Sequence, residues 1–198
     1  MTQANATPSA RQSELLEAAY GYVLERGLGE LSLRPLAKAI GTSPRVLLYL
    51  FGSKDGLVRA LLGRARSDEL ALLARLYALP PGDPAENRLP GVAALLWTWL
   101  ADPAHRALLA LWLEGYARSL VEPDGPWAGF ARATVQDWLD VLAAAQPADI
   151  RDTAAGRAER TEVLALLRGA LLDLLATGDT ARVHRAVRTR FGDPARLR

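Results

Sequence analysis

The sequence predicts an all-α protein of about nine or ten helices. Along most of the chain, apolar residues recur three or four positions apart, which is the period of a helix with one buried face. Serine, proline and glycine residues stand where such helices would begin and end. No alternating run of apolar and polar residues is long enough to predict a sheet.

Length and composition limit the possible functions. The chain has 198 residues, 50% of them hydrophobic, which allows one large domain or two small ones with a sizeable core. It contains no cysteine, which excludes disulfides and thiolate chemistry. His105 and His184 are far apart and lack ligand-like neighbours, so we expect no metal and no cofactor. The polar N-terminus and the absence of an apolar run of about 20 residues predict a cytoplasmic protein that does not cross a membrane.

Capping signals divide the N-terminal part of the chain into short helices. The first helix is expected from Ser9 to the residue before Gly27, which is a helix-stop signal. A second helix begins at Ser32 and ends at Gly41, and a third begins at Ser43, with a proline at its first helical position.

The third helix contains the uninterrupted apolar run VLLYLF, which on its own is also compatible with a buried strand. A helix places Leu47, Leu50 and Phe51 on one face and leaves Arg45 and Tyr49 on the opposite face. A strand would instead place Tyr49 on the same side as Leu47 and Phe51. The helix separates an apolar face from a polar one, and the capping residues on both sides favour it.

Two short helices joined by a tight glycine-containing turn form a helix-turn-helix, whose second helix enters the major groove of DNA. Arg45, near the start of that helix, can fork onto guanine, and Tyr49 on the same face suits a phosphate or a thymine methyl. Lys54, at the start of the next helix, suits a backbone phosphate. The alternative is a solvated helical hairpin with ordinary surface charges. The candidate DNA-contacting residues are Ser32, Arg34, Thr42, Ser43, Pro44, Arg45, Tyr49 and Lys54.

The charge distribution favours a nucleic-acid contact at the N-terminal end. Residues 1–66 contain nine basic and five acidic residues, whereas the remaining 132 residues contain fifteen basic and seventeen acidic ones. A small basic module on a slightly acidic body suits a contact with double-stranded DNA at one end of the molecule.

The stretch VLERGLGELSLRPLAKAIGTSPRVLLYLFGSKDGLVRALL resembles the DNA-binding domain of the TetR family of bacterial transcriptional regulators, over about residues 11–60. The resemblance implies an all-helical homodimer whose C-terminal body binds a small molecule, usually with release of DNA. It also maps the family's phosphate-contacting lysine onto Lys54. Leu48 and Leu50 stand where the family commonly has an aromatic residue and a histidine, so Leu48 lacks a hydroxyl often used on phosphate.

These observations predict two functional domains. A disordered tail is expected at residues 1–8, followed by a three-helix helix-turn-helix domain at 9–52. Residues 53–198 are expected to form a helical ligand-binding and dimerisation domain. Its first helix, over 53–79, connects the two domains, and PPGDP after it is the strongest break in the chain.

Aromatic residues with a few polar neighbours gather in the second half of the chain. Aromatics at helical spacing suit either an effector pocket or an ordinary core, and the residues alone leave both readings open. The resemblance favours a pocket in this region. The candidate ligand-binding residues are Trp97, His105, Trp112, Glu114, Tyr116, Trp127, Phe130 and Trp138.

The segment 161–179 is apolar on more than one face, which indicates that the helix has two partners. One partner is its own core, and the other is a second subunit or another part of the same chain. The segment resembles the family's dimerisation helix, which pairs with the helix before it, here about 126–145. The candidate dimerisation residues are Val163, Leu164, Leu167, Ala170, Leu171 and Leu174.

The leading functional hypothesis is a repressor that binds a near-palindromic operator as a homodimer and is released by a small apolar or aromatic effector. A helical dimeric adaptor and a transcriptional activator are the alternatives. An enzyme is not expected, because the body offers no nucleophile–base pair and no paired catalytic carboxylates. FGSKDG also lacks the spacing of a phosphate-binding loop.

Overall fold

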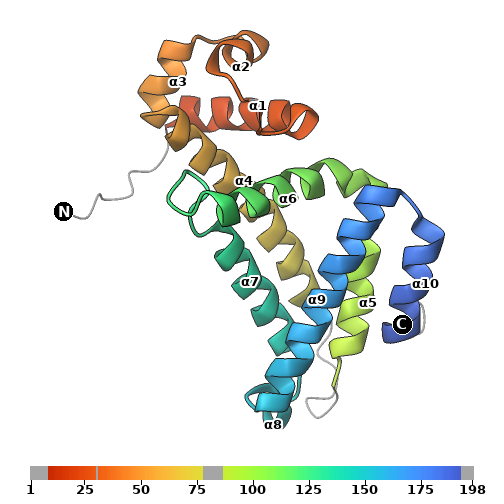
Figure 1. Cartoon of the computed structure of the whole chain (residues 1–198). Helices are drawn as coiled ribbons and strands as arrows, with labels where there is room; N and C mark the ends of the chain where they lie inside the picture. Colours follow the sequence, from red (N-terminus) through yellow and green to blue (C-terminus); the bar gives the residue numbers. More distant parts are fainter. Residues whose placement is uncertain (1–8, 30, 78–86, 193–198) are drawn as a thin grey trace. The chain divides into compact units, whose positions relative to one another are not determined.

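The computed structural model describes residues 9–29, 31–77 and 87–192. Over these residues it contains ten α-helices and one short 3-10 helix and no strand, which confirms the all-α prediction (Figure 1). The first four helices are α1 (Ala10–Arg26), α2 (Leu33–Ala39), α3 (Pro44–Phe51) and α4 (Lys54–Tyr77). The others are α5 (Leu89–Leu100), η1 (Pro103–His105), α6 (Arg106–Val121), α7 (Phe130–Ala144), α8 (Ala148–Arg151), α9 (Ala154–Thr177) and α10 (Thr180–Phe191).

The described residues group into two compact units. Unit 1 contains residues up to 67 together with 110–131, and unit 2 contains 68–109 together with the residues from 132 on. The helices α4 and α6 each have residues in both units. Because part of α6 packs with the N-terminal helices, this grouping differs from a simple division of the chain at residue 53. That functional division stays a prediction.

The helix α1 begins and ends at the signals read from the sequence. Ser9 Oγ accepts a hydrogen bond from the backbone N–H of Gln12 at 3.2 Å and caps the first turn. Gly27, with φ +79°, donates its N–H to the carbonyl of Val23 at 2.8 Å and ends the helix. The buried face of α1 consists of Leu15, Ala19, Tyr20 and Val23.

The core of unit 2 lies among α5, α7, α9 and α10, and α5, α9 and α10 lie side by side (Figure 1). Long aliphatic and aromatic side chains fill it, and burial of this apolar area is the main term that stabilises the unit. Its most deeply buried members include Leu89, Ala93, Leu96, Leu142, Leu167 and Val187.

Two expected helix boundaries differ in the structure. The helix expected at about 126–145 begins only at Phe130, because residues 122–129, with prolines at 123 and 126, form turns. Gly129 has φ +75° immediately before the helix begins. The apolar segment at 161–179 is part of a longer helix, α9, since Thr153 Oγ1 caps it by accepting from the N–H of Gly156 at 3.0 Å. The disordered tail and PPGDP fall outside the described residues.

A charged contact joins the end of α9 to the start of α10. Arg182 donates from both terminal nitrogens to the carboxylate of Asp173, at 2.7 and 2.6 Å. These hydrogen bonds lower the pKa of the Asp173 carboxyl from its ordinary value. The side chains of Arg182 and Asp173 are 53% and 39% exposed, so solvent screens the pair and it contributes little to the free energy of unfolding. Among the helices of the described residues, none combines the length and the hydropathy needed to cross a membrane.

Candidate DNA-binding and ligand-binding sites

A tight turn at residues 40–43 joins α2 to α3. Gly41 adopts φ +68°, a left-handed conformation that glycine takes without a steric cost. The N–H of Ile40 bonds to the carbonyl of Leu36 at 3.0 Å, and that of Thr42 to the carbonyl of Ala37 at 2.9 Å. These two bonds satisfy the last carbonyls of α2 and turn the chain directly into α3.

The start of α3 is fixed by Ser43 and Pro44. Ser43 Oγ accepts a hydrogen bond from the N–H of Val46 at 3.3 Å, and Pro44 occupies the first turn, where its missing N–H costs nothing. The Ser43 hydroxyl therefore caps the helix, and Thr42 and Pro44 are half-buried beside it.

The two faces of α3 differ as the helical wheel predicts. The Leu47 side chain is 1% exposed and anchors the helix in unit 1, with Leu50 and Phe51 half-buried around it. Arg45 is exposed on the opposite face, and the Tyr49 side chain is 84% exposed. A tyrosine left this open has no packing role inside the chain, so the outward face of α3 is available for a partner.

Leu48 and Val46 are also exposed on α3. Apolar groups on the outer surface of a recognition helix suit contact with thymine methyl groups but not with phosphates. Leu48 therefore has no hydroxyl that could bind a DNA phosphate, as the resemblance to the family pattern predicts.

The basic side chains near α2 and α3 lack carboxylate partners. In the described part of the chain, Arg34, Lys38, Arg45 and Lys54 are exposed and form no ion pair. Ser32, at the N-cap position of α2, is exposed as well and makes no capping hydrogen bond. In contrast, the basic side chains of Arg11 and Arg64 are paired with Glu14 at 2.8 Å and with Glu17 at 2.6 Å.

Lys54 is the first residue of α4. Ser53 Oγ accepts a hydrogen bond from the N–H of Gly56 at 2.9 Å and fixes this helix start. The free N–H groups of a helix start carry a partial positive charge, to which the lysine adds a full one. The arrangement suits a phosphate group.

Two contacts that hold the helix-turn-helix were not foreseen from the sequence. Gln12 Nε2 donates to the carbonyl of Leu50 at 3.0 Å and joins α1 to the end of α3. Glu114 on α6 accepts a hydrogen bond from the N–H of Leu28 at 2.8 Å, in the connection between α1 and α2. These partners are 38 and 86 positions apart, so no local sequence pattern reveals them.

Substitution Glu114→Ala is expected to lower the free energy of unfolding by about 1–3 kcal/mol, because the buried Leu28 N–H loses its acceptor. Glu114→Gln keeps an acceptor oxygen and should lose less. The exposed carboxylate of Glu122, just beyond α6, provides the control, since its pairing with Arg118 is worth at most about 1 kcal/mol. Urea denaturation of the variants measures the difference, and equal losses for Glu114→Ala and Glu122→Ala would contradict the assignment.

The candidate ligand-binding residues divide between the two units. In unit 1, the rings of Trp112 and Tyr116 lie 5.2 Å apart, and the Arg118 guanidinium lies 5.8 Å from the ring of Trp127. Phe130 packs closely against the backbone of α6, where a Cβ on Gly115 would lie 3.2 Å from its ring. The unit 1 members are Trp112, Glu114, Tyr116, Trp127 and Phe130.

The members in unit 2 are Trp97, His105 and Trp138. His105 stacks on Trp99 with ring centroids 4.0 Å apart, and its Nδ1 lies 3.0 Å from the Trp99 carbonyl oxygen. Trp138 donates its Nε1–H to the carboxylate of Glu69, whose side chain is only 5% exposed. Glu69 was not recognised from the sequence, because a single acidic residue on a long helix resembles any surface charge.

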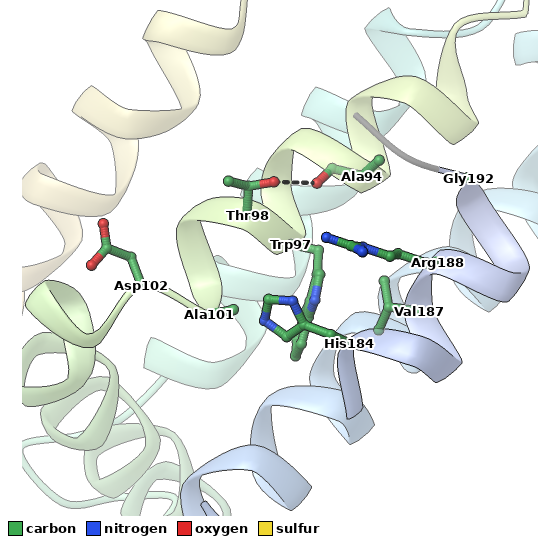
Figure 2. A pocket seen from close by; sticks show the side chains of 9 residues that line it. All are labelled: Ala94, Trp97, Thr98, Ala101, Asp102, His184, Val187, Arg188 and Gly192. Carbon is green, nitrogen blue, oxygen red and sulfur yellow. Dashed lines mark hydrogen bonds between the residues drawn. The ribbon is translucent and has the colours of Figure 1, made fainter. Parts of the chain in front are cut away.

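A pocket of about 300 Å³ lies between α5 and α10 (Figure 2). It contains Trp97 and also His184, which the sequence indicates only as an ordinary histidine. The two rings meet edge to face, with centroids 5.6 Å apart. The lining residues are Ala94, Trp97, Thr98, Ala101, Asp102, His184, Val187, Arg188 and Gly192.

Comparisons with known proteins agree with the helix-turn-helix. The family model described as bacterial regulatory proteins, tetR family, matches residues 15–61. The HTH-type transcriptional regulator BetI of Escherichia coli strain K12 is 26% identical, over 71% of this chain and 87% of BetI.

Two solved structures share the fold of almost the whole chain. A transcriptional regulator from Rhodococcus sp. Rha1 has a TM-score of 0.70 at 24% identity, covering 91% of this chain and 94% of the other. The multidrug binding protein EbrR in complex with proflavin has a TM-score of 0.63 at 24% identity, covering 90% and 98%. The neighbours and the matched family are transcriptional regulators and binding proteins rather than enzymes. By its helix-turn-helix and its all-helical fold, the chain is similar to TetR-family transcriptional regulators, and its residues 15–61 match the model of that family.

Proposed function

We propose that this regulator is a ligand-responsive repressor of the cytoplasm that binds a near-palindromic DNA operator as a homodimer. The observation that carries the proposal is the outward face of α3, where Arg45 and Tyr49 are exposed opposite the buried Leu47. A recognition helix needs an apolar face that anchors it and a polar face that reads bases. The exposed cations around it supply the attraction for phosphates.

Each candidate residue has a distinct role in this proposal. Arg45 reads a guanine in the major groove, and Tyr49 contacts a thymine methyl or a phosphate one turn later. Lys54 binds a phosphate at the start of α4, while Ser32 and Arg34 at the start of α2 hold the opposite side of the groove. Thr42, Ser43 and Pro44 set the angle at which α3 enters the groove.

The second subunit is proposed to bind the outward face of α9. Five of the six residues first proposed for dimerisation, all but Ala170, are buried in the core of their own chain. Buried side chains supply no surface to a partner. Ala165, Gly169 and Leu172 are exposed and, at spacings of four and three residues, share one face of α9. Leu172 is 54% exposed, and the small residues beside it permit the close approach of a partner helix, such as α7 or α9 of a second copy.

Leu172→Arg is expected to convert the dimer to monomers, because the partner would bury an unpaired charge. Light scattering measures the change as a fall to the mass of one chain, 21.4 kDa. Leu120→Arg is the matched control, since Leu120 is exposed on α6 and lies outside the proposed interface. If Leu172→Arg stays dimeric, the interface lies elsewhere.

An aromatic effector fits the buried polar and aromatic groups of the body. Trp138 and the carboxylate of Glu69 are hydrogen-bonded inside unit 2, and Thr134 on the same face of α7 is fully buried. Thr134 Oγ1 has no hydrogen-bond partner among the described residues, so a bound polar group would satisfy it. EbrR, which shares the fold, binds proflavin and ethidium, both of them planar aromatic molecules.

We propose that α4 and α6 transmit the effect of ligand binding from the C-terminal body to the helix-turn-helix. Both helices have residues in both units, and Glu114 on α6 is hydrogen-bonded to the connection before α2. An effector that binds more tightly to one arrangement of α4 and α6 would change the population of the DNA-binding state. The size of this change is set by the difference between the effector's affinities for the two states.

Selection of operators from a pool of random DNA duplexes tests the proposal. We expect an enriched inverted repeat with half-site centres about 34–36 Å apart. Enrichment of a single half-site, or no enrichment, would refute the dimeric repressor. Binding of proflavin is then titrated on the protein alone, because this dye also intercalates into DNA. Reporter transcription from the operator separates repression from the alternatives, since an activator raises it and an adaptor leaves it unchanged.

A further inference from the structure

We propose that the pocket between α5 and α10 is a binding site for a small aromatic carboxylate. This site involves none of the DNA-binding or dimerisation residues described above, and the inference does not depend on the proposed repressor function. It is based on two buried nitrogen atoms, one free guanidinium group and an apolar floor, all within unit 2.

Two nitrogen atoms of the pocket are buried and have no hydrogen-bond partner among the residues that the structure describes. The Trp97 side chain is 3% exposed, and its indole Nε1–H finds no acceptor in the described part of the chain. His184 Nε2 is likewise buried and has no partner within the described ranges, in a ring that meets the indole edge to face. An indole nitrogen can only donate, and a histidine with a proton on Nε2 donates as well. Unsatisfied buried donors are uncommon in folded proteins, and a ligand with acceptor oxygens would satisfy both.

Arg188 adds a positive charge beside these donors. Its guanidinium extends from α10 toward α5 in Figure 2, and it has no ion-pair partner in the described ranges. Two of the other three arginines of α10 are paired, Arg182 with Asp173 at 2.6 Å and Arg190 with Glu162 at 3.0 Å, and Arg185 lies outside the pocket lining. A free guanidinium at the edge of a pocket suits a carboxylate, which it can bind through two parallel hydrogen bonds.

The rest of the pocket defines the size and orientation of the ligand. Ala94, Ala101 and Val187 provide an apolar lining, and about 300 Å³ lies at the small end of ligand pockets. Asp102 lies beyond the C-terminal end of α5, away from Arg188 in Figure 2, and one of its oxygens accepts from the Ala104 N–H at 2.9 Å. The carboxylate of the ligand therefore points toward Arg188, and its ring packs beside Trp97.

Calorimetric titration of the full chain with benzoate, benzamide and benzamidine tests the inference. These three probes share one ring and nearly one shape but are negative, neutral and positive. We expect benzoate to bind best and benzamidine worst. Absence of benzoate binding, or binding of benzamidine at least as tight, would overturn the proposal.

Three variants test the assignment to this pocket. Arg188→Gln should weaken benzoate binding at least about tenfold, which corresponds to the loss of a charge-assisted hydrogen bond. Arg185→Gln, at an exposed arginine of the same helix outside the lining, should have no effect. Asp102→Asn keeps the oxygen that caps η1 but removes a negative charge, so benzoate should bind no more weakly.

Equal effects of the two arginine substitutions would overturn the proposal. Operator binding by Arg188→Gln should match that of the unaltered chain, which separates a failure of this site from a failure of the repressor function.

Discussion

Arg45→Ala weakens binding to the selected operator by about 5- to 150-fold, which corresponds to about 1–3 kcal/mol. Arg45 lies on the outward face of α3 near the helix start, where recognition helices contact base edges. It has no ion pair within the described residues, so the guanidinium is available to DNA. Its loss should also relax the preference for one base pair in each half-site. Fluorescence anisotropy on the operator and on operators substituted at that base pair measures both effects.

Two further substitutions show whether the loss is specific. Lys54→Ala should weaken binding to all these duplexes by the same factor, because a phosphate contact carries no sequence information. Arg185→Ala removes an equal charge from an exposed position of α10 and should leave the affinity almost unchanged. If Arg45→Ala behaves like Lys54→Ala across the duplexes, Arg45 contacts the backbone and not a base.

Gly56→Ala destabilises the chain by about 3 kcal/mol, since the new methyl group has no space. A Cβ on Gly56 would lie 2.0 Å from the carbonyl oxygen of Phe51 and 3.2 Å from its carbon. Both atoms belong to the backbone, so a side-chain rotation relieves nothing, and the junction between α3 and α4 must shift. The N–H of Gly56 also donates to Ser53 Oγ, which caps α4. Chemical denaturation measures the loss of stability, and operator affinity should fall with it because Lys54 lies in the same turn.

Gly63→Ala, seven residues further along α4, is the matched control. A Cβ there meets nothing within 4 Å, and alanine is the better helix former. This variant should therefore be more stable than the unaltered chain by up to about 1 kcal/mol. A similar loss of stability in both variants would show that α4 disfavours alanine for a reason other than the Phe51 carbonyl.

The sequence predicts the fold class and the two faces of α3 well because the signals for both are local. A helix was expected to begin at Ser43, and Ser43 Oγ accepts the backbone hydrogen bond of Val46 three residues further on. The period of 3.6 residues likewise assigns Leu47 to the buried side and Tyr49 to the exposed side of α3. No knowledge of other helices is needed for either prediction.

The sequence predicts the body less well, because burial there depends on which helices meet. The helix α9 is apolar on two sides, and only the structure shows that Leu167 and Leu171 face their own core while Leu172 faces outward. The pocket joins Trp97 on α5 to His184 on α10, and no pattern in the sequence relates the two. The sequence makes Glu114 a candidate ligand-binding residue. In the structure its carboxylate accepts a hydrogen bond from the Leu28 N–H, in the connection between α1 and α2.

The dependence of operator affinity on salt tests most directly whether the exposed cations of α2, α3 and α4 bind DNA phosphates. The logarithm of the association constant should fall linearly with the logarithm of the salt concentration, by about 0.9 for each phosphate neutralised. Lys54→Ala should reduce this slope by about one unit, and Arg185→Ala should leave it unchanged. A flat salt dependence, or a slope that changes equally in both variants, would contradict DNA binding through this surface.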